Sequence, residues 1–266
     1  MKSYVFILCP PYSGSTLLWK LVSTSDAVSS LPKEGQFLPE VRKVMRRDPW
    51  NSNEQFPWET IKEVWNKYWD PSKPLLLEKS PPNIIRTREI IEHFSPIYFL
   101  LMVRNPYAHC ESLMRRNKVN AEEAAEFTLR CMRQQAENVA NLDVSLAFTY
   151  EALVQNPKLI AEKIQSFIPQ IGELQYDKKF ETRAIDGIQS RKIVDFNQKK
   201  IDNLSLSDLD KINRALGENK DIMEYWGYEF YTPPPQHGLI FIKTRSQVWF
   251  SKGWRFARKT IRETLR

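Results

Sequence analysis

The sequence predicts an α/β fold in which a mostly parallel sheet lies between layers of helices. Short apolar runs typical of buried strands, such as residues 4–9 and 97–103, alternate with segments of helical periodicity as far as residue 168. Parallel strands need such helical crossovers, and the helices then cover both faces of the sheet. With 266 residues the chain can bury one large core or two modest ones.

The turn that follows the first strand has the composition of an anion site. Residues 10–16 read Pro-Pro-Tyr-Ser-Gly-Ser-Thr, and an apolar helical pattern begins at Leu17. At such a helix start, backbone N–H groups without partners and the helix dipole both favour an anion. Gly14 allows the backbone to approach a ligand closely. The plainer alternative is that Ser13 or Ser15 only caps the helix.

This turn is not a Walker A loop, which requires the pattern G-x-x-x-x-G-K-[ST]. It holds one glycine and no lysine. The hydroxyls of Ser13, Ser15 and Thr16 add hydrogen-bonding groups instead.

Three further strand ends should meet this turn at one edge, because ligands of open parallel sheets bind where the strands end. A short strand near residues 25–31 precedes the loop that carries Glu34, and a strand over residues 74–78 ends at Lys79. The strand over residues 97–103 ends at Arg104, and the helix after it carries Ser112. A lysine, a guanidinium and a hydroxyl suit phosphate oxygens. A solvated loop Glu34 and an ion pair of Arg104 with an acidic residue are the alternatives.

The other segments carry less chemistry. The apolar stripe in residues 58–69 contains Trp65 and Trp69 at helical spacing, and it is either core or the roof of an acceptor pocket. Residues 178–200 are polar and basic, as expected of a surface or ligand-covering segment. A proline-rich stop at residues 232–235 separates a domain of residues 1–231 from a basic amphipathic extension of residues 232–266. That extension suits an anionic membrane or a polyanion, or it packs on its own domain or on a partner subunit.

Composition narrows the partners and the compartment. The net charge of +7 and the pI of about 9.2 favour anionic partners. Three widely spaced cysteines show no metal-binding spacing, so a reducing compartment without structural zinc is expected. Neither a signal peptide nor a membrane span is predicted, and we therefore expect a cytoplasmic protein.

In combination, four motifs resemble those of the sulfotransferases that use 3′-phosphoadenosine 5′-phosphosulfate (PAPS). These are Pro11-Tyr-Ser-Gly-Ser-Thr-Leu-Leu18, Glu34-Gly-Gln-Phe37, Glu78-Lys-Ser-Pro81, and Arg104-Asn-Pro106 with Ser112. The similarity runs through residues 4–230 and is greatest to tyrosylprotein, heparan-type and bacterial sulfotransferases. It implies a P-loop-like three-layer fold.

The resemblance also implies a role for each matching position. Glu34 would be the general base, and Lys79 would stabilise the transferring sulfuryl group and the leaving phosphate. The 5′-phosphosulfate would be held by Tyr12, Ser13, Gly14, Ser15, Thr16 and Leu17. Arg104 and Ser112 would bind the 3′-phosphate, and Ser190 loosely matches a serine that contacts the donor. The product would be adenosine 3′,5′-bisphosphate (PAP), and no metal would be required.

The chain departs from these relatives at two positions. Tyr12 stands where they have a lysine or arginine, so Lys79 or Lys20 would have to supply that charge. Pro81 occupies the position of the catalytic histidine of the cytosolic enzymes, which excludes a histidine base there. Glu78 is an alternative to Glu34 as the general base. It directly precedes Lys79, however, and neighbouring residues of a strand point to opposite faces, so Glu78 is expected to point away from the side of Lys79.

The acceptor is left open among small molecules, glycans, lipids and peptides that offer a hydroxyl or an amine. No nucleic-acid partner is expected, and a homodimer is left open. Two other functions compete with sulfuryl transfer. One is a P-loop-type nucleotide kinase, and the other is a non-catalytic binding protein that retains a nucleotide fold.

Overall fold

The structure, a computed structural model, describes residues 2–184 and 187–242. It contains two compact units. Unit 1 comprises the described residues up to Arg104 together with Arg130–Phe180 and Arg191–Val194. Unit 2 comprises Asn105–Leu129 and the described residues of Glu181–Ser190 and from Asp195 on. The predicted boundary at residue 231 stays a prediction, and residues 243–266 of the basic extension lie outside the described residues.

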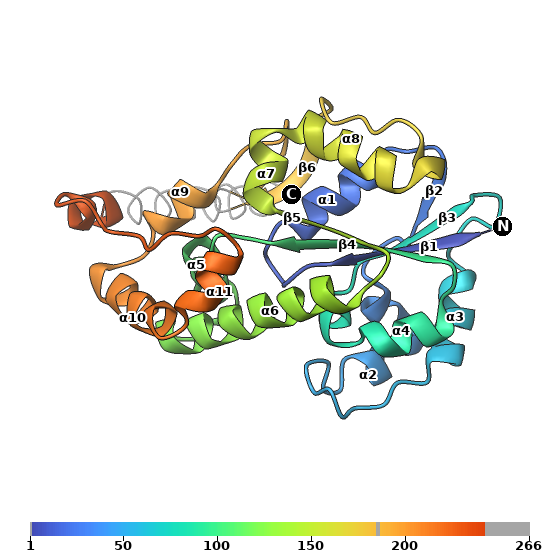
Figure 1. The fold of residues 1–266 in the computed structure, drawn as a ribbon, viewed down its shortest axis with the longest axis horizontal. Coiled ribbons are helices and arrows are strands. Elements are labelled where there is room, and N and C mark those ends of the chain that lie inside the picture. The colour runs from blue at the N-terminus through green and yellow to red at the C-terminus, as the bar shows by residue number, and fades with distance from the viewer. Residues whose placement is uncertain (1, 185–186, 243–266) are drawn as a thin grey trace, which may run out of the picture. The chain divides into compact units, whose positions relative to one another are not determined.

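A five-stranded parallel sheet forms the centre of unit 1 (Figure 1). Its order is β2-β3-β1-β4-β5, and every neighbouring pair is parallel. This confirms the predicted α/β class with a parallel central sheet. The strands are β1 (Ser3–Leu8), β2 (Val28–Ser30), β3 (Leu75–Glu78), β4 (Ile97–Val103) and β5 (Ser145–Thr149).

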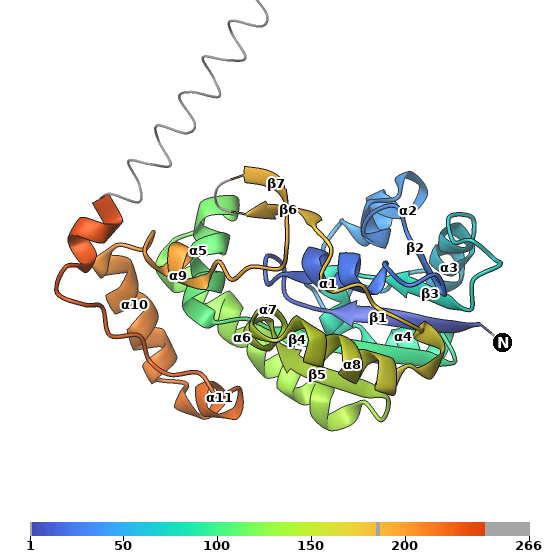
Figure 2. The ribbon, with the colours of Figure 1, turned by 90° about the horizontal axis from the view of Figure 1, so that it is seen from above.

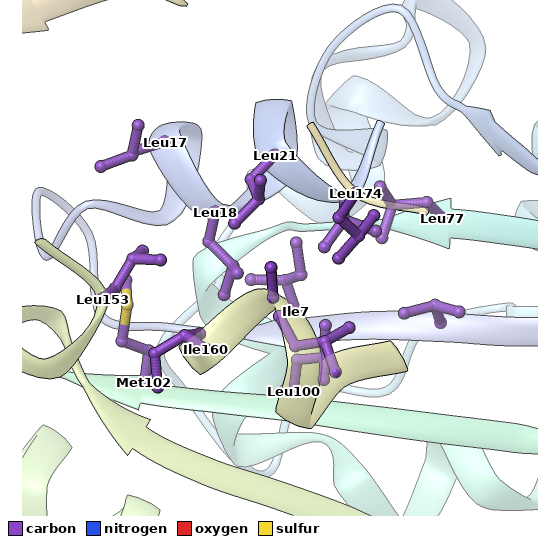
Figure 3. Close-up of a cluster of buried hydrophobic side chains, with 14 of the residues drawn as sticks. Ile7, Leu17, Leu18, Leu21, Leu77, Leu100, Met102, Leu153, Ile160 and Leu174 are labelled. Atoms are coloured by element: carbon purple, nitrogen blue, oxygen red, sulfur yellow. The ribbon is translucent and has the colours of Figure 1, made fainter. Parts of the chain in front are cut away.

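Helices cover both faces of this sheet (Figures 1 and 2). On one face lie α1 (Ser15–Val22), α7 (Tyr150–Gln155) and α8 (Pro157–Phe167). Figure 3 shows the core between them, where Ile7, Leu100 and Met102 of the strands pack with apolar side chains of these helices. The strands point their alternate residues to this face because the side-chain period of a strand is two.

The opposite face is packed with aromatic rings. Here lie α3 (Trp58–Asn66), α4 (Thr87–His93) and the part of α6 (Ala121–Asn141) that belongs to unit 1. Phe6 of β1 contacts Trp65 and Phe94, and the rings of Trp65 and Phe94 stack with centroids 5.6 Å apart. The aromatic stripe of α3 is therefore core, as the first of its two interpretations predicted.

Shorter elements complete unit 1. They are η1 (Gly35–Phe37), α2 (Pro39–Met45), η2 (Pro81–Ile85) and η3 (Pro169–Ile171). The apolar spacing of Ile84, Ile85, Ile90 and Ile91 predicts one helix over residues 83–94, but the structure divides this segment into η2 and α4 at Arg86. The buried Arg86 guanidinium donates to the backbone carbonyls of Asn51 and Glu54, and this anchoring accounts for the break.

Unit 2 is mainly helical. It contains α5 (Pro106–Asn117), α9 (Asn197–Ile201), α10 (Leu206–Gly217) and α11 (Lys220–Tyr225), with α5 packed against α9 and α10. The polar segment 178–200 also forms β6 (Phe180–Ala184) and β7 (Gly187–Arg191), which pair as a two-stranded sheet. Within the described part of the chain, no helix is both long and apolar enough to cross a bilayer.

Candidate active site

The turn between β1 and α1 leads into a helix whose N-terminus has no side-chain cap. Gly14 precedes α1 with a φ of 100°, and no side chain caps this helix. The hydroxyl of Ser13 donates instead to the Pro10 carbonyl at 2.5 Å, and the Ser13 N–H reaches the same oxygen at 3.3 Å. Ser13 therefore stabilises the turn, and the start of α1 keeps the polarity that favours an anion.

Gly14 is required at its position by both conformation and space. An added Cβ would lie 2.5 Å from Cδ2 of Tyr150, far inside normal contact distance. Tyr150 is buried, and its hydroxyl donates to the Val194 carbonyl at 3.3 Å. Because the positive φ also disfavours any side chain, glycine is the residue that this turn accommodates without strain.

Lys79 and Glu34 form an ion pair beside this turn. The Lys79 ammonium lies 2.8 Å from Oε1 of Glu34 and donates to the Thr16 hydroxyl at 3.3 Å. Lys79 is buried, whereas the Glu34 side chain is 20% exposed. The structure thus brings together the ends of three segments that the sequence placed at one sheet edge: the turn after β1, the loop after β2 and the end of β3.

Glu78 has a different environment from its neighbour. Its carboxylate is 1% exposed and accepts four hydrogen bonds, from the Gly35 N–H, the Ser80 N–H, the Ser80 hydroxyl and the Asn83 amide. Burial raises the pKa of Glu78, and the hydrogen bonds from Ser80 and Gly35 oppose that rise only in part. A carboxylate enclosed in this way is poorly placed to receive a proton from a substrate.

Arg104 extends from the end of β4 to the same turn. Its Nη1 donates to the Tyr12 carbonyl at 3.3 Å, and its guanidinium carbon lies 3.9 Å from the centre of the Tyr150 ring. Tyr12 itself has a φ of 64°, in the left-handed region of backbone conformation. The expectation that Arg104 and the turn share an edge of the sheet is confirmed.

Unit 2 contains a buried cation next to Ser112. The Lys200 ammonium donates to the Ser112 hydroxyl at 2.6 Å, and that hydroxyl donates to the Ala108 carbonyl at 2.9 Å. Lys200 is 5% exposed. The sequence offered only the basic character of residues 178–200 as a signal, because the pairing depends on how α9 packs on α5.

Ser190 lies on the exposed side of β7, and its hydroxyl makes no hydrogen bond with other described residues. Its assignment as a donor contact stays a prediction. The described residues contain no cluster of three or more His, Cys, Asp or Glu side chains with the geometry of a metal site.

Fold and site together define an α/β protein with polar and charged side chains gathered beside a helix N-terminus at the carboxyl edge of a parallel sheet. The chain belongs to the sulfotransferase family, whose sequence model matches residues 4–169. The predicted family is therefore confirmed, and the protein is a sulfotransferase.

Several solved structures are similar. The sulfotransferase of Alicyclobacillus acidocaldarius superposes with a TM-score of 0.53 at 11% identity, over 86% of this chain and 97% of that one. The sulfotransferase domain of the Synechococcus PCC 7002 olefin synthase gives 0.43 at 23% identity, over 64% and 74%. Mouse sulfotransferase SULT7A1, solved in complex with PAP, gives 0.47 at 15% identity, over 85% and 89%. A search of curated proteins finds no match. The first of these similarities supports the fold.

Proposed function

We propose that this protein transfers the sulfuryl group of PAPS to a hydroxyl or amine acceptor, with Glu34 as general base. The observation that carries the proposal is the Lys79–Glu34 pair at 2.8 Å, held beside Thr16 at the N-terminus of α1. This arrangement suits sulfuryl transfer. The carboxylate can take the proton that leaves the acceptor, and the lysine and the N-terminus of α1 can stabilise the negative charge that develops on the leaving phosphate.

The residues have separate tasks in this reaction. The acceptor oxygen or nitrogen forms a bond to sulfur while the bond from sulfur to the phosphate oxygen of PAP breaks. Glu34 takes the acceptor proton, a contribution of about 10²–10⁴-fold for a positioned base. Lys79 and the N–H groups at the start of α1 stabilise the charge that develops on the leaving phosphate.

Within unit 2, we assign Ser112 and Lys200 to the 3′-phosphate of the donor. The buried Lys200 ammonium donates to the Ser112 hydroxyl at 2.6 Å. A cation next to a hydroxyl matches the chemistry of a phosphate monoester. Lys200 thereby adds a charge beside the serine that the resemblance assigned to this phosphate.

The test compares donor turnover with donor binding. We expect Glu34→Gln and Lys79→Ala each to lower the turnover of radiolabelled PAPS by at least 10²-fold on a panel containing a sugar, a fatty alcohol, a phenol and a tyrosine peptide. The affinity of Glu34→Gln for PAP should change little in calorimetry. Glu40→Gln is the control, because Glu40 is an exposed glutamate of α2 whose side chain accepts hydrogen bonds from Tyr68.

Three outcomes would contradict the proposal. Full turnover by Glu34→Gln would exclude it as the base. Thermal stabilisation by ATP with Mg²⁺ but not by PAP would favour a nucleotide kinase. Binding of PAP without turnover on any acceptor, together with no hydrolysis of PAPS, would favour a non-catalytic binding protein.

A further inference from the structure

The two residues that flank Lys79 bind the backbone that follows Glu34. Glu78 accepts a hydrogen bond from the Gly35 N–H at 2.7 Å, and the Ser80 hydroxyl accepts one from the Gln36 N–H at 3.1 Å. The Ser80 hydroxyl in turn donates to Glu78 at 2.6 Å. Alternation along an extended chain explains the arrangement, because Glu78 and Ser80 share one side and Lys79 takes the other.

The loop of Glu34 is also confined from a second side. A Cβ added to Gly35 would lie 2.5 Å from the indole of Trp65, so the Gly35 backbone rests directly on this ring. Trp65 is fully buried and stacked on Phe94. Gly35 is thus held between a carboxylate and a core tryptophan, which leaves the peptide next to Glu34 little freedom.

Among the described residues, two groups donate to the Glu34 carboxylate, and both depend on the same short segment. Lys79 binds Oε1, and the Gln36 side chain donates to Oε2 at 2.6 Å. Lys79 lies within the segment 78–80, and the backbone of Gln36 is fixed by Ser80. The direction of the Glu34 carboxylate is therefore set from residues 78–80.

We propose that Glu78 is a positioning residue for sulfuryl transfer, which acts through Glu34 by holding the Gly35 peptide with the help of Ser80. The inference rests on the proposed role of Glu34 as the base. Glu78 has four hydrogen-bond donors around it and is almost completely buried, so its function is to orient the base and not to accept the acceptor proton.

The experiment uses Glu78→Gln, which keeps the shape of the side chain but replaces one acceptor oxygen by an amide donor that faces other donors. We expect kcat to fall by about 10²-fold, the cost of a displacement on the order of 1 Å at a catalytic group, while the Kd for PAP stays within about 2-fold. Hydrogen exchange of the backbone N–H groups of Gly35 and Gln36 should accelerate. Ser80→Ala should show the same pattern in a milder form, and it serves if Glu78→Gln fails to fold.

A double-mutant cycle separates positioning from general loss of stability. Glu34→Gln/Glu78→Gln should turn over no more slowly than Glu34→Gln alone, because the second change acts only through the first residue. Glu89→Gln is the matched control. Glu89 is half-buried and accepts hydrogen bonds from the buried side chains of Arg86 and Trp58, and it has no hydrogen bond to Glu34 or Lys79 within the described residues. It should lower stability and leave kcat unchanged.

The results distinguish the two proposals. If Glu34→Gln is slow but Glu78→Gln and Ser80→Ala keep the wild-type kcat, the positioning role is refuted and the base stands. If the two changes multiply, or if Glu89→Gln lowers kcat as much as Glu78→Gln does, Glu78 has only a structural role. If Glu34→Gln is fully active, the base is wrong and the inference falls with it.

Discussion

The steric fit of Gly14 against Tyr150 gives a prediction that can be worked out in free energy. In Gly14→Ala the left-handed backbone costs about 1–2 kcal/mol for any residue with a Cβ. The new methyl group meets Tyr150 at 2.5 Å, and this overpacking adds about 1–3 kcal/mol. Tyr150 cannot retreat freely, because it is buried and lies 3.9 Å under the Arg104 guanidinium. The total is about 2–5 kcal/mol.

A matched glycine isolates the contact with Tyr150. Gly227 has a φ of 70°, and an added Cβ would meet nothing within 4 Å. Gly227→Ala should therefore cost only the backbone part, about 1–2 kcal/mol. Urea unfolding followed by tryptophan fluorescence measures both losses, and calorimetry measures the Kd for PAP. Gly14→Ala should also weaken PAP binding at least about 10-fold, because the turn must shift to relieve the strain. A shift that costs about 1.4 kcal/mol of binding free energy already raises the Kd by that factor. Equal destabilisation of the two variants, with PAP binding intact in both, would refute the reasoning.

Three further predictions concern charge and thiol reactivity. Tyr12→Lys should tighten PAP binding by about 10-fold at low salt, because a charged hydrogen bond contributes about 1.5–3 kcal/mol, and Tyr12→Gln should not. Lys200→Met should weaken the binding of PAP about 10-fold but leave the binding of adenosine 5′-monophosphate, which has no 3′-phosphate, unchanged. Equal weakening of the binding of both nucleotides would contradict a contact between Lys200 and the 3′-phosphate. Burial raises the pKa of each of the three buried thiols to about 12, so a thiol reagent at pH 8 should label none in the native protein and all three in urea. Rapid native labelling would contradict that burial. The thiols are Cys9, Cys110 and Cys131.

The alternation of the five central strands with helices, as far as residue 168, could be predicted from the sequence, and so could the edge of the sheet at which polar strand-end residues meet. Short continuous apolar runs and helical stripes are local signals, and parallel strands joined by helices must end at one edge of the sheet. That rule was enough to bring Glu34, Lys79, Arg104 and the turn at Gly14 together. The glycine was identifiable because its neighbours are small and polar, as in turns that bind anions.

Other features depended on contacts between residues far apart in the chain. The break at Arg86 was not predictable from the sequence, because it coincides with buried hydrogen bonds from Arg86 to distant backbone carbonyls. The strands within residues 178–200 were not predictable either, because they depend on the pairing of β6 with β7. For Trp65 the sequence left two interpretations open, a core residue or part of the roof of an acceptor pocket. The packing of Trp65 against Phe6 shows that it is a core residue.

The amino-acid sequence by itself determined which residue types stand at the ends of the strands, and hence the family and the anion-directed edge of the sheet. Only the tertiary structure decided which atoms meet there: Glu78 at the Gly35 N–H, Lys200 at the Ser112 hydroxyl and Tyr150 against Gly14. The physical reason is that periodicity reports which side of an element is buried. Periodicity does not report which group a buried polar side chain bonds to. That partner is determined only in the folded chain, where the side chain is removed from water and must satisfy its hydrogen bonds with the groups around it.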